Sequence, residues 1–194
     1  MHSSYRYYLD LSSTRTGIII MKSDVSEMPQ LSDYQKMMHM KDIYDIDAIM
    51  NSDADIIIGS VSFAGFSTDT DSQVERQTEK VRYIAEWFRR LQKAFPPDAV
   101  YMEGIFVMPS RMSASELLLK LHGALAVVFS CPILYISPSG IKKSVAGKGN
   151  ASKTAVRDGV VQKTGIDPFN LDESDAMALY LASLEGREMA CQQY

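Results

Sequence analysis

Cysteine and histidine are scarce in this chain of 194 residues. It contains only two cysteines, Cys131 and Cys191, and three histidines that lie far apart in the sequence. The cysteine count excludes a disulfide scaffold and a cysteine-based zinc module, and it is typical of a reducing compartment. The histidines form no pair at helical spacing, so the zinc hydrolase motifs are absent as well.

Long hydrophobic runs and a leader-like N-terminus are also missing. The longest apolar stretch covers residues 117–129, and Lys120 and His122 interrupt it, which makes it too short to span a bilayer. The first ten residues are polar and include Asp10, unlike a signal peptide. We therefore expect a protein with no membrane contact and no secretion signal that works in the cytoplasm.

A large charge of one sign is absent too, because 20 basic and 24 acidic residues leave a formal net charge of −4. This balance argues against a protein that coats nucleic acid by bulk charge. The distribution is uneven, since residues 42–79 carry nine acids and one base, whereas residues 141–165 carry six cations and one acid. The six cations are Lys142, Lys143, Lys148, Lys153, Arg157 and Lys163. They predict a directed anion-binding site, and a solvated helix face is the alternative.

Apolar residues make up 46% of the chain and charged residues 23%, which is typical of one ordinary globular domain. The hydrophobic pattern predicts, in order, a hairpin of strands 5–9 and 17–21, a loop with one short helix over 22–50, a strand at 54–63, a helix at 74–95, a strand at 99–102, a helix at 116–129, a strand at 131–136, two helices within 137–165, and a last helix at 172–184. We expect Ser113 or Ser115 to cap the helix at 116–129. The Met-rich residues 37–40 favour a helix or core filling over a partner surface. This order indicates an α/β architecture with mixed strand directions.

Four carboxylates stand at positions suited to chemistry. Asp10 ends the first strand and Glu103 ends a later one, while Asp172 and Asp175 lie three residues apart on one face of the last helix. Carboxylate oxygens suit hard divalent cations, and a pair of such ions can activate a water and stabilise the leaving oxygen of a phosphodiester. The alternative is structural, with Asp172 as a helix cap, Asp175 as a first-turn acid and Asp10 as the start of a turn. Glu103 is harder to explain this way, because an unpaired acid after a buried strand is costly.

Four segments, in this order, resemble the RuvC family of Holliday-junction resolvases within the ribonuclease H-like fold. The turn YLDLSSTRTG (8–17) is similar to the family's D-P-G-x-x-x-T-G, although Leu11-Ser12 replaces Pro-Gly. YMEGIF (101–106) resembles its second acidic strand. ISPSGIKKSVAGKGNASKTAV (136–156) resembles its A-P-x-x-V-K…G-x-G-x-A-x-K segment, and DESDAMAL (172–179) its closing D-x-x-D-A-x-A helix. The resemblance extends from residue 5 to about residue 185.

The resemblance implies specific roles for residues of this chain. It implies that the metal ligands and catalytic acids are Asp10, Glu103, Asp172 and Asp175. Lys153 joins them as a catalytic cation. The DNA-binding residues would be Phe106, Lys142, Lys143, Lys148, Lys153 and Arg157, with Phe106 stacking near the junction centre. The implied fold is a ribonuclease H-like mixed sheet of about five strands flanked by helices. It would form a single nuclease domain over residues 1–194 with an insertion around 22–53.

The implied activity is a Mg²⁺-dependent endonuclease that resolves Holliday junctions by paired nicks in strands of like polarity, with water as the nucleophile. Mn²⁺ is expected to substitute. A homodimer would place two sites across the two-fold axis of the junction. The apolar helix at 116–129 fits such an interface, unless the helix at 74–95 covers it. The alternatives are a broader fork and flap nuclease of the same fold, a non-catalytic branched-DNA module, which would lack an acid, and an actin-like nucleotide-binding protein, which would need further glycine-rich phosphate loops.

Overall fold

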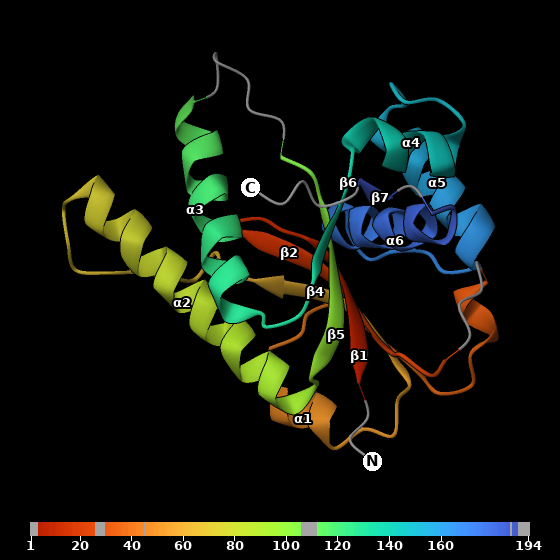
Figure 1. Cartoon of the computed structure of the whole chain (residues 1–194), viewed down its shortest axis with the longest axis horizontal. Helices are drawn as coiled ribbons and strands as arrows, with labels where there is room; N and C mark the ends of the chain where they lie inside the picture. The colour runs from red at the N-terminus through yellow and green to blue at the C-terminus, as the bar shows by residue number, and fades with distance from the viewer. Residues whose placement is uncertain (1–3, 26–29, 45, 106–111, 187, 190–194) are drawn as a thin grey trace.

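A mixed β-sheet of seven strands forms the centre of the described part of the protein (Figure 1). The computed structural model describes residues 4–25, 30–44, 46–105, 112–186 and 188–189. The strands are β1 (Tyr5–Asp10), β2 (Arg15–Lys22), β3 (Met37–Met40), β4 (Ile56–Ser62), β5 (Pro97–Glu103), β6 (Ile133–Ile136) and β7 (Glu188–Met189), in the order β3-β4-β2-β1-β5-β6-β7. β2 runs antiparallel to β1 and β4, and β7 to β6, while the other pairs are parallel. The expected α/β fold is confirmed, and the short strands β3 and β7 extend the sheet at its edges.

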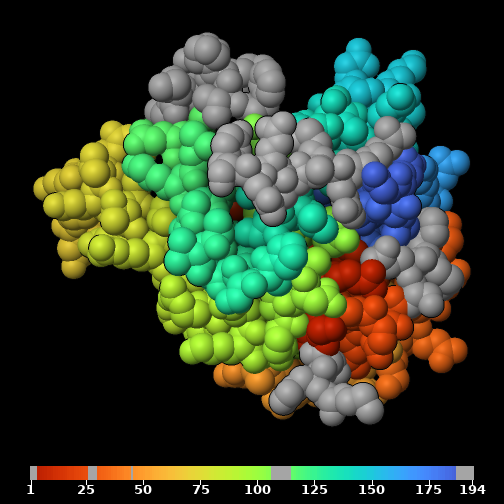
Figure 2. Space-filling model, viewed as in Figure 1, coloured from red at the N-terminus to blue at the C-terminus, as the bar shows by residue number. Residues whose placement is uncertain are grey.

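Helices cover both faces of the sheet (Figure 1). The helices are α1 (Ile46–Met50), α2 (Gln73–Ala94), α3 (Met112–Val128), α4 (Pro138–Ala146), α5 (Lys153–Thr164) and α6 (Leu171–Leu184), with a 3₁₀ turn at Leu31–Asp33. Figure 2 shows α2 and α3 on one side of the molecule and α4 and α5 on the opposite side. None of the helices in the described segments is long and apolar enough to cross a membrane.

The middle of β1, residues 7–9, is buried on both faces of the sheet. Tyr7 points to the α2 and α3 side, where its ring meets Phe129 edge to face at 5.8 Å. Tyr8 points to the opposite side, where its ring meets Tyr180 of α6 at 5.1 Å. Alternate residues of one strand therefore hold two separate helical layers, and the end of β1 is fixed between them.

The structure differs from four local expectations. Residues 37–40 form strand β3, which pairs in parallel with β4, so backbone pairing at an open sheet edge outweighs the helical preference of methionine. Core filling, the other expectation for this segment, is confirmed, because Met37, Met38 and Met40 pack against the core. Helix α3 begins at Met112, so Ser113 and Ser115 lie inside it and do not cap it. Asn170 caps α6 by accepting a hydrogen bond from the Glu173 N–H at 2.9 Å, so the structural alternative for Asp172, that of a helix cap, is wrong and Asp172 is a first-turn acid. The predicted strand at 131–136 starts only at Ile133.

The start of α6 lies directly against β2 at Gly17. A Cβ atom at Gly17 would lie 1.8 Å from the backbone oxygen of Asp172, which is far inside van der Waals contact. We predict that Gly17→Ala lowers the free energy of unfolding by about 3 kcal/mol, because the helix must move away from the sheet. Urea denaturation measures this change. The matched control is Gly65→Ala, where no atom lies within 4 Å of the new methyl group and stability should hardly change. Equal stabilities of the two variants would contradict this packing.

Candidate active site

A cavity of about 240 Å³ opens at the carboxyl ends of the central parallel strands β1 and β5. The register pairs Leu9 with Met102, so Asp10 and Glu103 follow at the same edge of the sheet. Both carboxylates line the cavity. Two acids that are 93 positions apart in the sequence therefore face one space, because parallel strands end at a common edge.

Helix α6 brings two further acids to this edge. Asp175 lines the cavity. Asp172 lies one turn earlier and does not line the cavity among the described residues, although its charge acts on Asp10. The three-residue spacing puts both acids on the same face of α6. The structure thus gathers three of the four predicted acids around the cavity and places the fourth beside it.

Burial and mutual repulsion disfavour ionisation of these acids. Burial is the largest cause that raises the pKa of Asp10 well above its usual value. The negative charges of Asp175, Glu103 and Asp172, in decreasing order, raise the pKa of Asp10 further. Burial also raises the pKa of Glu103 and of Asp175. Such a cluster is unfavourable at neutral pH unless positive charge is close.

Two lysines supply part of that positive charge from the neighbouring helices. Lys153 is the first residue of α5, and its Nζ lies 3.4 Å from Asp175 Oδ2. The Asp175 charge is the largest cause that raises the pKa of Lys153. Lys142 of α4 lines the same cavity, and its positive charge opposes the rise that burial causes in the pKa of Glu103. Of the predicted lysines, Lys142 and Lys153 therefore face the acids across the cavity.

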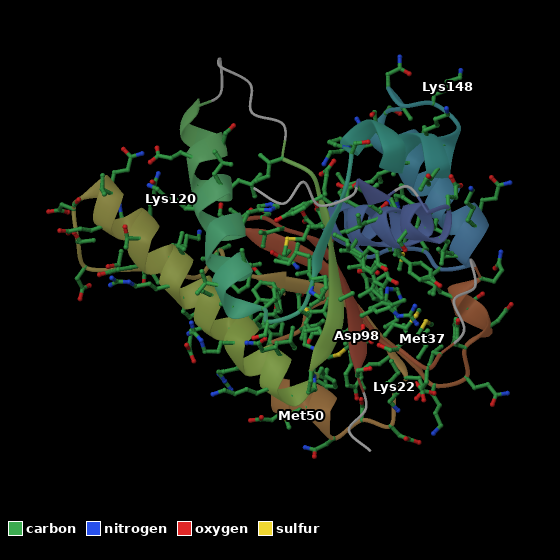
Figure 3. All side chains as sticks on the ribbon, in the orientation of Figure 1. Lys22, Met37, Met50, Asp98, Lys120 and Lys148 are labelled. Atoms are coloured by element: carbon green, nitrogen blue, oxygen red, sulfur yellow. The ribbon has the colours of Figure 1, made fainter. Side chains whose placement is uncertain are left out.

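The other predicted DNA-binding residues are placed differently. Lys143 is exposed in the last turn of α4. Lys148 lies on the exposed loop that joins the end of α4 to the start of α5 (Figure 3). Arg157 binds within the chain, because its guanidinium lies 2.8 Å from Asp167 Oδ1 and donates to the Pro168 carbonyl. Phe106 lies outside the described residues.

The donor set suits a hard, hydrated divalent cation. In the described segments, no group of three or more His, Cys, Asp or Glu is close enough together to form a ready-made ligand set. Mg²⁺ seldom uses such a set, since it keeps several waters and binds one or two carboxylates together with phosphate oxygens. Asp10, Glu103 and Asp175 offer oxygens around one polar cavity, and their repulsion favours a bound cation. The residues therefore fit a metal that is completed by water and substrate.

Two polar residues near this site were not predicted from the sequence. His122 of α3 lines an adjoining cavity of about 250 Å³ with Asp10 and Glu103, and burial lowers the pKa of His122 to about 4. Its place in an apolar helix gave no signal of this position. Glu173 lies fully buried between the two acids of α6. The available signal was an acid three residues after Asn170, which is the capping-box spacing.

Comparison with known proteins identifies relatives of this chain. A family model described as crossover junction endodeoxyribonuclease RuvC matches residues 63–183. The RuvC of Chloroherpeton thalassium is 34% identical over 108 residues, which cover 53% of this chain and 58% of that protein. The RuvC of Trichlorobacter lovleyi is 26% identical over 117 residues, or 59% of this chain and 66% of that protein. The chain thus matches less than two thirds of the length of these relatives.

Solved structures share the fold over a longer range. The structure of Thermus thermophilus RuvC in complex with a Holliday junction superposes with a TM-score of 0.63 and 18% identity, covering 96% of this chain and 98% of that chain. The yeast mitochondrial Holliday junction resolvase Ydc2 superposes with a TM-score of 0.53 and 11% identity, covering 93% and 77%. These similarities show the fold. Because the family model covers well over half of the sequence, the chain belongs to the RuvC family.

Proposed function

We propose that this chain is a metal-dependent, structure-selective endonuclease that resolves Holliday junctions by paired nicks in strands of like polarity. The observation that carries the proposal is the meeting of Asp10, Glu103 and Asp175 with Lys142 and Lys153 around one cavity. Membership of the RuvC family supports it, since dependence on a divalent metal is typical of that family. We place the activity in the cytoplasm of a bacterial or phage-infected cell, where recombining DNA supplies the substrate.

The proposed metal ligands are Asp10, Glu103, Asp172 and Asp175, and the proposed ion is Mg²⁺, with Mn²⁺ as a substitute. When bound, the metal supplies Lewis-acid activation of water and neutralises charge on the scissile phosphate. Lys153 and Lys142 hold the phosphate against the acids, and their charges offset negative charge that develops in the transition state. The acids orient the attacking water, because their oxygens accept its hydrogen bonds. No protein nucleophile takes part.

The DNA path that we propose follows α4 and the loop after it. Lys143 and Lys148 are exposed there, beyond Lys142, and would contact phosphates that flank the cleaved bond. Stacking by Phe106 and a DNA contact by Arg157 stay predictions, and Arg157 would first have to release Asp167. We also propose that residues 1–194 form one nuclease domain with an insertion around 22–53.

A second copy of the chain is the proposed partner at α3. Helix α2 covers one side of α3, where Gln92 donates to the Val128 carbonyl at 2.7 Å and Lys120 donates to Gln77 at 3.2 Å. The expected packing of α2 against α3 therefore exists. Leu119 and Val127 of α3 are nevertheless 46% and 84% exposed. Isologous contact through this apolar side would bury it and set two active sites at a fixed separation.

The test of the activity compares wild type with Asp10→Asn on labelled four-way, fork, flap and duplex DNA in Mg²⁺. We predict paired nicks in the four-way junction by wild type, and loss of nicking with retained junction binding in Asp10→Asn. In EDTA at pH 7 the variant should have the higher Tm, because it removes a charge that burial disfavours. This gain should shrink as the pH falls, since the wild-type carboxyl then becomes neutral.

Asp69→Asn is the control for that experiment, since Asp69 is exposed and does not line the cavity. It should keep both the activity and the Tm of the wild type. Nicking by Asp10→Asn at the wild-type rate would refute the site. Equal cleavage of forks and flaps by the wild type would favour the broader nuclease.

The salt dependence of junction binding tests the DNA path. Each lysine–phosphate contact releases counterions, so Lys142→Ala with Lys148→Ala should reduce the slope of log K against log[salt] by about two. Fluorescence anisotropy at several salt concentrations, in EDTA, measures the slope. Lys36→Ala is the control, because Lys36 pairs with Asp53 on a different part of the surface. An unchanged slope in the double variant would leave these lysines as a solvated face.

The dimer is tested by a charge on the exposed side of α3. We predict that Val127→Asp gives a folded monomer that makes unpaired nicks, because two charges would face each other across the two-fold axis. Sedimentation velocity measures the assembly, and nick mapping on a cruciform plasmid measures the pairing. Val74→Asp, at an exposed position of α2, is the matched control and should leave the dimer intact. A wild-type monomer that still makes paired nicks would contradict the proposal.

A further inference from the structure

Glu173 is a fully buried carboxylate between Asp172 and Asp175, and the proposed reaction does not use it. Acids are rarely buried to this degree unless they are paired. Its Oε2 accepts a hydrogen bond from the Phe169 N–H at 3.3 Å, just before the cap of α6. Its Oε1 pairs with Nε2 of His39. A carboxylate only accepts, so the imidazole donates. His39 therefore supplies a hydrogen-bond partner for Oε1, the carboxylate oxygen of Glu173 that does not bond the Phe169 N–H.

His39 comes from strand β3, within the segment 22–53 that was predicted as an insertion. It lies opposite Ile58 in the parallel pairing with β4. Its side chain is only 20% exposed, and its ring packs on Phe169 with centroids 4.4 Å apart. The edge strand thus makes a polar contact with the first turn of α6, at Glu173, and an aromatic contact with Phe169 just before the helix.

A second connection joins the chain after His39 to the same helix end. The amide of Asn170, the cap of α6, donates to Ser60 Oγ at 3.0 Å. Ser60 Oγ in turn donates to the Lys41 carbonyl at 3.0 Å. Arg15 also donates to Ser60 Oγ, at 2.9 Å, and pairs with Asp42. Residues 39–42 are therefore joined to the buried acid of α6 directly, through His39, and to the cap of α6 through Ser60.

The same helix start also packs against β2, because the Asp172 carbonyl leaves no room for a Cβ atom at Gly17. The first turn of α6 thus contacts two strands of the sheet, β2 through Asp172 and β3 through Glu173. The acids at positions 172 and 175 lie on this turn and the next. A small shift of the turn would move both of them relative to Asp10, which is fixed on β1.

We propose that His39 is a positioning residue for the metal site, acting through Glu173 on Asp172 and Asp175. The inference rests on the proposed function, since it takes these two acids as metal ligands. It assigns the edge strand β3 a role in the reaction beyond covering a sheet edge. Outer contacts that orient metal ligands commonly change metal affinity by about 10- to 100-fold when they are removed.

Calorimetric titration of the full chain with Mn²⁺ alone tests this inference, using His39→Gln and His39→Asn. The amide nitrogen of glutamine reaches about as far as imidazole Nε2, whereas the asparagine amide ends one carbon earlier. We expect His39→Asn to weaken Mn²⁺ binding about tenfold and His39→Gln to restore most of the affinity. A purely structural role would lower the Tm of His39→Asn without weakening Mn²⁺ binding by the folded protein.

Lys36→Met is the control in the same segment, because the Lys36–Asp53 pair is exposed and does not touch α6. It should keep the wild-type affinity for Mn²⁺. A folded His39→Asn variant with wild-type affinity would overturn the inference. Should that variant not fold, His39→Phe decides, since it keeps a ring against Phe169 and removes the donor to Glu173, and unchanged Mn²⁺ affinity there overturns the inference too. Wild-type protein that binds no Mn²⁺, or whose binding Asp10→Asn does not weaken, would refute the proposed metal site itself.

Discussion

Repulsion between carboxylates held at one edge of the sheet is the constraint on which the rest of the structure depends. The parallel pairing of β1 with β5 brings Asp10 and Glu103 together, and α6 adds Asp175. Burial and like charge disfavour their ionised forms, as the raised pKa values of all three show. The fold tolerates this cost because two rigid helical layers fix the strand end between them. The same repulsion makes the cavity a favourable place for cations.

The surrounding elements are arranged to offset this negative charge. Helices α4 and α5 direct Lys142 and Lys153 towards the acids, and the first turn of α6 is fixed by its cap and by Gly17. Phosphate and a hydrated metal ion can share this cavity, because the positive metal offsets negative charge on both the acids and the phosphate. The edge strand β3 contributes through His39, which contacts the buried Glu173. The acids proposed to bind the metal and the contacts that fix the helix therefore lie together at the start of α6.

Much of the fold followed from local pattern. The hairpin, the amphipathic helix α2 and the glycine-rich loop between α4 and α5 were predicted because periodicity and turn residues determine them over short distances. Strand β3 was not, because methionine has no strand preference and the pairing with β4 depends on residues almost twenty positions away. The extent of α3 was also missed at its start, where Ser113 resembled a cap. Local sequence patterns fail to predict a structure that depends on pairing at a sheet edge or on a distant segment.

The sequence by itself determined the four acids, the two facing lysines and the order of the segments that carry them, because residue type and spacing are local properties. Only the tertiary structure decided which of these side chains meet. It placed Asp10, Glu103 and Asp175 around one cavity, left Asp172 beside it, and engaged Arg157 with Asp167. It also buried Glu173 against His39, across 134 positions of sequence. Such contacts arise from sheet register and helix packing, which join distant segments and leave no trace in the spacing of either one.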